Sequence, residues 1–207
     1  LTTNAVDELL KGVVNNTGVI EANSLAGITG HVELFAHGGE VQVGGKLEAK
    51  EGFIETSGRD FSIDKDAKIE TAEWLIDPVD ITINDTLASA IATQLGSGNV
   101  TIETGAANTP DTSGNEILKY GDIFVASNIN YTGTNESTLT LKAYRNIVFA
   151  NEYGTYGTNG TNGTQPSQKG SISSNNAALN VVLWSRAGDT ATEANSYRKG
   201  SVWVPVG

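Results

Sequence analysis

Cysteine is absent from the 207-residue sequence. Its absence excludes disulfide bridges, thiolate nucleophiles and thiolate metal ligands together. No apolar run approaches the roughly 18 residues that a membrane-spanning helix needs, so we expect no membrane insertion. The sequence also lacks an initiator methionine and a charged and then apolar leader. We therefore expect it to be a section of a longer chain.

Positive charge is scarce, since 13 Lys and Arg residues stand against 24 Asp and Glu residues, which gives a formal net charge of −11. A negative field of this size repels the phosphates of nucleic acids and the headgroups of anionic lipids. We expect no nucleic-acid partner. Without disulfides, an extracellular chain of this composition has to be stabilised by packing alone.

Short β-type stretches recur at near-regular intervals between residues 18 and 84, among them "GVIEA", "GHVELFA", "GEVQVGG" and "DITIN". Each holds two or three apolar residues in alternation, and most are bounded by Gly, Asn or Asp. No Asn-Gly or Asp-Gly turn, which would indicate an antiparallel hairpin, separates them. Three strands per coil would give a repeat on the order of 20 residues, which is typical of a solenoid. The pattern predicts an all-β parallel β-helix, and the alternative is a β-sandwich.

Two segments have helical periodicity instead. Residues 2–14 place apolar side chains at helical spacing, which predicts a short helix or helical turn at the end of the stack. The stretch "DTLASAIATQLGSG" predicts a helix of about ten residues, with Asp85 or Thr86 as its N-cap and Gly96 as its stop. We expect one β-helical section over residues 1–207. Coils are regular over 1–83, whereas over 84–207 a short helix and long loops interrupt them.

The longest polar insertion, Glu152–Lys169, contains only two large apolar side chains, Tyr153 and Tyr156. A tyrosine in a Gly-rich loop has no core to join, and recognition loops combine such aromatic anchors with Gly, Ser and Asn. The smaller insertions Ala106–Glu116 and Ala187–Lys199 are of the same kind. We predict that these loops bind a partner; the alternative is a merely solvated insertion. The candidate partner-binding residues are Tyr153, Thr155, Tyr156, Asn159, Asn162, Gln165 and Lys169.

Tryptophan and histidine are interpreted structurally. Trp74, Trp184 and Trp203 lie in stretches with alternating apolar neighbours, so we predict that their rings pack inside the stack or at a coil edge. His31 and His37 are about 20 Å apart in an extended chain, at about 3.3 Å per residue, and cannot share one metal ion. We expect no metal and no cofactor.

One set of motifs resembles a known family. The strand in "EWLIDPVDITI", followed by the helical "LASAIATQL" and then "GNVTIET", resembles the secreted partner of two-partner secretion systems of Gram-negative bacteria. That family includes filamentous haemagglutinin-like and high-molecular-weight adhesins, contact-dependent inhibition proteins and heme-hemopexin-binding exoproteins. Four more pieces follow the family's order over residues 1–150, namely "NNTGVIEA", "GGKLEAKEGFIETSGRDFSI", "GDIFVASNINYTG" and "STLTLKAYRNIVF".

The resemblance implies a right-handed parallel β-helix, export through a dedicated outer-membrane partner, and a secreted or cell-surface location. It also implies a passenger section that acts as an adhesin or virulence factor. We expect non-enzymatic binding of a host protein or glycan through the projecting loops. The alternatives are capture of hemopexin to promote heme release, with no heme ligand from this chain, and a purely structural spacer.

A polysaccharide-active enzyme is the outside alternative. The stretch "DFSIDKDAK" offers Asp60, Asp64 and Asp66 beside Arg59, but its spacing departs from a Ca²⁺-binding loop, and we interpret these residues as solvated corner carboxylates. The sequence also holds seven Asn-x-Ser/Thr sites. Several arise by chance in an Asn- and Thr-rich chain, whereas the resemblance implies modification with simple hexoses, for which Asn159 and Asn162 are the candidates. The other five are Asn15, Asn84, Asn99, Asn130 and Asn135.

Overall fold

The computed structural model describes residues 12–105, 120–152, 167–175, 178–185 and 202–204. These residues form β-strands and one α-helix, and every pairing between the strands is parallel. The predicted all-β, parallel architecture is confirmed. The elements are β1 (Val14–Asn16), β2 (Val19–Glu21), β3 (His31–Val43), β4 (Lys46–Ile63), β5 (Lys68–Asp77), β6 (Ile81–Ile83), α2 (Asp85–Gln94), β7 (Asn99–Glu103), β8 (Ile123–Val125), β9 (Ile129–Tyr131), β10 (Ser137–Ala143), β11 (Ile147–Val148), β12 (Ile172–Ser174), β13 (Leu179–Ser185) and β14 (Val202–Trp203).

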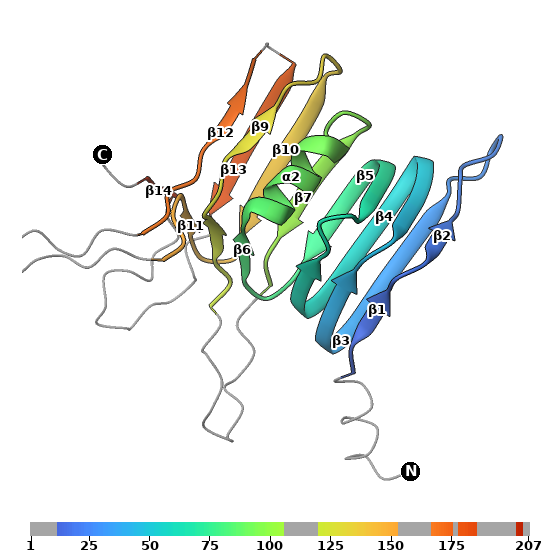
Figure 1. The fold of residues 1–207 in the computed structure, drawn as a ribbon, viewed down its shortest axis with the longest axis horizontal. Helices are drawn as coiled ribbons and strands as arrows, with labels where there is room; N and C mark the ends of the chain where they lie inside the picture. Colours follow the sequence, from blue (N-terminus) through green and yellow to red (C-terminus); the bar gives the residue numbers. More distant parts are fainter. Residues whose placement is uncertain (1–11, 106–119, 153–166, 176–177, 186–201, 205–207) are drawn as a thin grey trace, which may run out of the picture.

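The strands form three sheets. The largest has the order β1-β3-β4-β5-β7-β10-β13, with β2 also paired to β4. Figure 1 shows its strands side by side in chain order, from β3 near the N-terminal end to β13. A second sheet has the order β14-β11-β8-β6, and β12 pairs with β9 in a third. Because strands that neighbour each other in a sheet also follow each other in the chain, the molecule grows in one direction as the sequence advances.

The register shows how much chain separates stacked positions. His31 lies opposite Phe53, and Lys46 lies opposite Lys68, so the separation is the same for both pairs. This spacing agrees with the repeat length that the sequence predicts for a solenoid. The separation is nearly twice as long further along the chain, where Ser137 lies opposite Leu179. The extra chain is accommodated between strands, and the pairing itself stays parallel.

Several stretches that the sequence predicts as separate strands run together as one. β4 contains three of them, and its pairing with β5 shifts register between Ala49 and Phe53. At this bend Glu51 has a φ of 55°, which a non-Gly residue seldom adopts. A Cβ at Gly52 would lie 2.3 Å from the carbonyl oxygen of Gly30, so only glycine fits this corner. The chain therefore turns without ending its hydrogen-bonded ladder.

The core lies along the inward-facing rows of these strands. β10 alternates between buried and half-buried residues, and its Leu139 and Leu141 are fully buried. They lie directly opposite Val100 and Ile102 of β7, which are also fully buried. Each inward side chain therefore packs on the equivalent side chain of the neighbouring strand, and burial of this kind contributes about 25 cal/mol per Å² of apolar surface.

The tryptophans divide into one confirmed prediction and one error. Trp74 is fully buried, and its indole nitrogen donates to the Thr56 hydroxyl at 3.2 Å. Trp184, in contrast, is 57% exposed, so of the two predicted places, inside the stack or at a coil edge, the first is wrong. It occupies an outward position of β13, the last described strand of its sheet, one residue after the inward Leu183. The side chain of Trp203 lies outside the described residues.

Helix α2 takes the place of a strand between β5 and β9, and it packs against both. Its existence and length are as predicted, but its N-cap is Asn84, whose side chain accepts the Leu87 N–H at 3.0 Å. Below the helix, the buried Gln94 side chain donates to the Thr71 carbonyl at 2.7 Å. Above it, the Ser137 hydroxyl donates to the Leu95 carbonyl. Side chains thus replace the ladder bonds that a strand would make.

Two further expectations concern helices. The helix predicted over residues 2–14 falls mainly outside the described residues, although Val14 already belongs to strand β1. Among the residues that the structure describes, no helix has the length and apolar character needed to cross a membrane.

The cap of α2 generates a stability prediction. Asn84→Ala removes the acceptor for the Leu87 N–H, and we expect a loss of about 1 kcal/mol in the free energy of unfolding. Asn84→Asp keeps an acceptor and is expected to stay close to the parent protein. Urea denaturation followed by circular dichroism measures both, with the exposed Thr82→Ala as control. Equal stability of Asn84→Ala and the parent would show that the cap contributes nothing.

Candidate functional site

Most of the predicted partner-binding residues lie outside the described residues, namely Tyr153, Thr155, Tyr156, Asn159, Asn162 and Gln165. Lys169 is described, and it is exposed. The insertions Ala106–Glu116 and Ala187–Lys199 also fall outside. The structure does describe the points where these segments leave and rejoin the strands, and those points define the candidate site.

The segment 153–166 leaves and returns at a single point, where Asn151 joins the two ends. The Asn151 backbone N–H donates to the Gln168 carbonyl at 3.1 Å, and its side-chain oxygen accepts the Gln168 N–H at 3.0 Å. Its side-chain nitrogen donates to the Ser167 hydroxyl at 3.0 Å. Just before it, Ala150 is fully buried. One asparagine therefore closes the base of the insertion against the core.

The segment 106–119 has a closed base as well. On its N-terminal side the Thr104 hydroxyl donates to the carbonyl oxygen of Gly121, on its C-terminal side, at 2.9 Å. The Gly105 N–H donates to the Pro78 carbonyl at 3.1 Å. Gly121 has a φ of 81°, and a Cβ there would lie 2.5 Å from the Cβ of Tyr144. Glycine is therefore required where the two ends meet.

A third segment, 186–201, is bounded by paired strands. Ser185 lies opposite Ala143, and Val202 lies opposite Ile147, so both ends are fixed by register. Between Ala143 and Ile147 the chain turns in only three residues, 144–146. The residues that flank this turn also pair with residues that flank the 106–119 segment: Lys142 pairs with Glu103, and Ile147 pairs with Ile123. The base of the 106–119 segment therefore lies on the other side of the same turn. Two insertions thus start on opposite sides of one tight corner.

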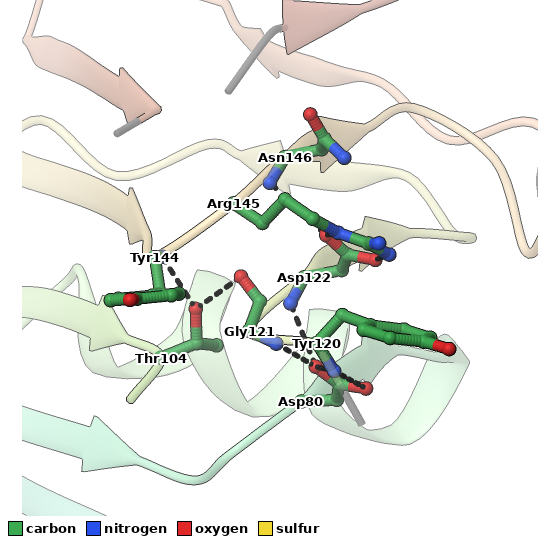
Figure 2. Close-up of polar contacts among 8 residues, drawn as sticks. All are labelled: Asp80, Thr104, Tyr120, Gly121, Asp122, Tyr144, Arg145 and Asn146. Atoms are coloured by element: carbon green, nitrogen blue, oxygen red, sulfur yellow. Dashed lines mark hydrogen bonds and ion pairs between the residues drawn. The ribbon is translucent and has the colours of Figure 1, made fainter. Parts of the chain in front are cut away.

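A ladder of polar side chains holds this corner together (Figure 2). The Asp80 carboxylate accepts three successive backbone N–H groups, from Tyr120, Gly121 and Asp122. At the equivalent position before the next strand, the Asp122 carboxylate accepts the Asn146 N–H at 3.1 Å. Each carboxylate therefore binds the backbone at the equivalent position before the neighbouring strand. Burial raises the pKa of Asp80 above its ordinary value, and the backbone donors oppose that effect.

The Arg145 guanidinium neutralises Asp122, the more deeply buried of these two carboxylates. Its guanidinium binds both oxygens of Asp122, with Nε at 2.7 Å from Oδ1, and the two side chains are 13% and 2% exposed. The guanidinium also lies over the Tyr120 ring, 4.2 Å from its centroid. Because burying either charge without the other would cost several kcal/mol, the pair opposes arrangements of the corner that separate Arg145 from Asp122.

The sequence reasoning missed Asp80, Asp122 and Arg145. A signal for the ladder was present, because "DITI", "DIFV" and "NIVF" each place Asp or Asn directly before a buried strand. Ile81, Ile123 and Ile147 are register partners, so the residue before each one stacks at the same corner. Comparisons of the chain with protein-family models, with curated proteins and with solved structures give no match.

The carboxylates of the enzyme alternative are arranged differently. Asp64 and Asp66 are exposed, and Asp66 lies 3.9 Å from the Lys65 ammonium in a pair that is more than four-fifths exposed. Within the described part of the chain, no group of three or more His, Asp or Glu side chains is placed to hold a metal ion. Asp64 and Asp66 are thus solvated, as predicted, whereas Asp60 is half-buried within strand β4.

A groove of about 550 Å³ runs beside α2. The strand segment Lys68–Glu70 forms one wall, and the hydroxyls of Thr86, Ser89 and Thr93 follow one face of the helix along the other. None of its lining residues belongs to the bases of the insertions. The groove is therefore separate from the candidate site.

Five of the seven Asn-x-Ser/Thr sites lie in described residues, and four of these make side-chain hydrogen bonds. The Asn135 amide nitrogen, the atom that a sugar would occupy, donates to the Gly96 carbonyl at 2.7 Å. Asn159 and Asn162 lie outside the described residues, so their glycosylation stays a prediction. The other hydrogen-bonded side chains are those of Asn84, Asn99 and Asn130.

The outer face of the largest sheet carries most of its charge as carboxylates. Asp77 neighbours Glu103 and Glu55 on this face, and burial together with these two charges raises its pKa to about 6. Lys142, which pairs with Glu103, only partly offsets this effect. The opposite case is Glu48, whose pKa is lowered to about 2 mainly by the hydrogen bond from Lys46.

The buried pair at the corner generates a second prediction. Arg145→Ala leaves the Asp122 carboxylate buried without its cation, and we expect a loss of about 3 kcal/mol in the free energy of unfolding. Adding Asp122→Asn should recover part of this loss, because no charge is then buried. Lys65→Ala, in an exposed pair, is the control and should change stability by under about 0.5 kcal/mol. Similar effects for Arg145→Ala and Lys65→Ala in urea denaturation would contradict the role of the pair.

The raised pKa of Asp77 generates a third prediction. Between its ordinary pKa of 3.8 and the native value of about 6, the folded state binds the proton more tightly than the unfolded state. Stability therefore falls as the pH rises through this window. After discounting for solvent screening, Asp77→Asn should be about 1 kcal/mol more stable than the parent at neutral pH and equal to it at the acid end of the window. Urea denaturation across this pH range measures the difference, with the exposed Glu73→Gln as control. Parallel pH profiles for Asp77→Asn and the parent would exclude this effect.

Proposed function

We propose that the chain is a section of a right-handed parallel β-helix. Three observations support this architecture: every strand pairing is parallel, stacked positions recur at a near-constant interval in the first coils, and buried rows continue from strand to strand. Parallel strands joined by crossovers are right-handed in nearly all proteins, which supports the handedness. In this arrangement each coil contributes three sides, and the corners between them are the only places for extra chain.

We further propose that this section is a non-enzymatic host-binding part of a secreted or cell-surface exoprotein. It would contact a host protein or glycan through its insertions. The observation that carries the proposal is the placement of two insertions, 106–119 and 186–201, on opposite sides of the three-residue corner 144–146. With strands about 4.8 Å apart, their bases are separated by roughly 10 Å. Segments attached this closely present one composite surface.

The closed bases favour binding over a spacer role. Asn151 and Thr104 tie the ends of two insertions together, so each insertion starts from a rigid support. Fixing the ends of a loop before binding lowers the conformational entropy lost on contact with a partner. Binding residues are often held in this way, on loops positioned by a rigid scaffold. A spacer has no need of three long insertions or of the asparagine that closes one of them.

The lineage of the protein is part of the proposal. Resemblance to two-partner secretion exoproteins supports export through an outer-membrane partner and an adhesin or virulence role at the bacterial surface. The same resemblance offers hemopexin as one specific host protein. The experiment decides which host molecule is bound. Its two leading outcomes are binding to an epithelial surface and binding to hemopexin.

The test replaces residues 153–166 with a short Gly-Ser linker and keeps Asn151, Ser167 and Gln168, so that the base of the loop stays closed. We expect the variant to fold with an unchanged thermal transition and to lose binding to epithelial cells or to a protein captured from human serum. Tyr153→Ala together with Tyr156→Ala should weaken binding by roughly tenfold or more, as for aromatic anchors elsewhere. The matched control is Phe35→Ala, which removes an exposed aromatic ring on β3, away from the insertions.

The outcomes separate the alternatives. Hemopexin captured from serum by the parent, but not by the loop variant, identifies heme acquisition. Cell binding without hemopexin identifies an adhesin. If the parent protein binds neither cells nor any serum protein, the binding proposal fails and the spacer role is left. If the loop variant binds as well as the parent, residues 153–166 are not the binding segment, and the insertions 106–119 and 186–201 are the ones to replace next.

A further inference from the structure

The groove between β5 and α2 has the dimensions of a ligand site. Its volume of about 550 Å³ lies inside the range of about 300–1,000 Å³ that small-molecule sites occupy. Ala67 and Ile69 on the strand side and Ala90 on the helix side give it an apolar lining. Every lining residue belongs to the continuous described stretch 12–105, so both walls of the groove are complete.

Positive charge gathers at this groove. Three of the six lysines in the described residues line it, in a chain whose formal net charge is −11. Lys46 and Lys68 are register partners on neighbouring strands, where like charges repel each other. Lys46 is compensated by ion pairs with Glu48 and Glu70. The exposed Lys68 ammonium has no carboxylate partner among the described residues, so one cation at the groove is left for a ligand.

The helix wall of the groove supplies hydroxyl groups. Thr86, Ser89 and Thr93 are spaced by three and four residues, which places them on one face of α2. The Thr93 hydroxyl donates to the Ser89 carbonyl at 2.9 Å. The hydroxyls of Thr86 and Ser89 have no hydrogen-bond partner within the described chain. Because a hydroxyl both donates and accepts, this row suits a ligand that carries hydroxyls of its own.

The charges of the lining restrict the ligand further. Three ammonium groups face the carboxylates of Glu70 and Asp85, so the lining has a net charge of +1 (three minus two). A polyanion would be repelled by these two carboxylates and by the negative charge of the whole protein. A single negative charge on the ligand is matched, and Glu70 and Asp85 can accept hydrogen bonds from its hydroxyls.

We propose that this groove binds a sugar unit that carries one carboxylate, a uronic acid or a sialic acid within a glycan. The Lys68 ammonium binds the carboxylate. The hydroxyls of Thr86 and Ser89 and the carboxylate of Glu70 bind hydroxyls of the ring, and Ala90 packs on its apolar face. The site is separate from the insertions, and it does not depend on the function proposed for them.

The test measures binding of glucuronic acid and of N-acetylneuraminic acid to the 207-residue protein by ligand-detected NMR and calorimetry, with glucose as the uncharged counterpart of glucuronic acid. We expect a Kd of about 1 mM or lower for at least one acid, weakening as salt is added, and no binding of glucose. Lys68→Gln removes the unpaired cation and should weaken binding roughly tenfold. The matched control is Lys142→Gln, which makes the same change of charge on the outer face of the largest sheet. Unchanged thermal transitions show that both variants are folded.

The outcomes are distinct from those of the loop experiment. Binding of only one of the two acids identifies the type of sugar. The variant that lacks residues 153–166 should bind the acid as the parent does, and a loss of binding in that variant would assign the sugar to the insertion and overturn the groove as its site. The proposal also fails if neither acid binds at millimolar concentration, if glucose binds as tightly as glucuronic acid, or if Lys68→Gln binds as tightly as the parent.

Discussion

Parallel in-register stacking is the constraint on which the rest of this structure depends. Each inward side chain lies on its counterpart in the neighbouring strand, as Leu139 does on Val100, so the interior is a set of apolar rows. Rows of this kind fill only if equivalent positions carry similar side chains, and they leave no interior room for additional residues. Extra chain is therefore confined to the corners. There the backbone leaves the ladder, and its polar groups need other partners, which Asp80 and Asp122 supply.

The same constraint connects the scaffold to the proposed function. In the proposed β-helix, a corner carboxylate that binds the backbone of the next coil holds successive coils together independently of what is inserted between them. Thr104 and Asn151 then close the insertions at their bases, so that the length and composition of a loop have little effect on the packing below it. In the proposed β-helix, residues that determine stability and residues that determine binding are thus largely different residues.

Much of the architecture could be predicted from the sequence, because alternation, glycine spacing and helical periodicity are local signals. The strands, the absence of hairpins among the described strands and the helix Asp85–Gln94 follow from them. The errors arise where a distant neighbour decides. Asn84 and Asp85 are both acceptable N-caps by composition, and in the structure the N-cap is Asn84, whose side chain accepts the Leu87 N–H. Trp184 has the alternating neighbours of a core residue, but its strand is the last described one of its sheet. Arg145 acquires its role only when stacking places it beside Asp122.

Helix α2 interrupts the backbone hydrogen bonding between neighbouring strands on its side of the molecule. On its side of the stack the backbone ladder stops at Thr71 and starts again at Ile129, and only side-chain bonds such as that of Gln94 bridge the gap. In the proposed β-helix, stability is close to a sum over nearest-neighbour interfaces. At α2 the ladder of the largest sheet continues from β5 to β7, whereas the ladder on the helix side is missing. Amide protection against hydrogen exchange should therefore be lower on the helix side than on the side of the largest sheet. Local unfolding should therefore begin at the helix.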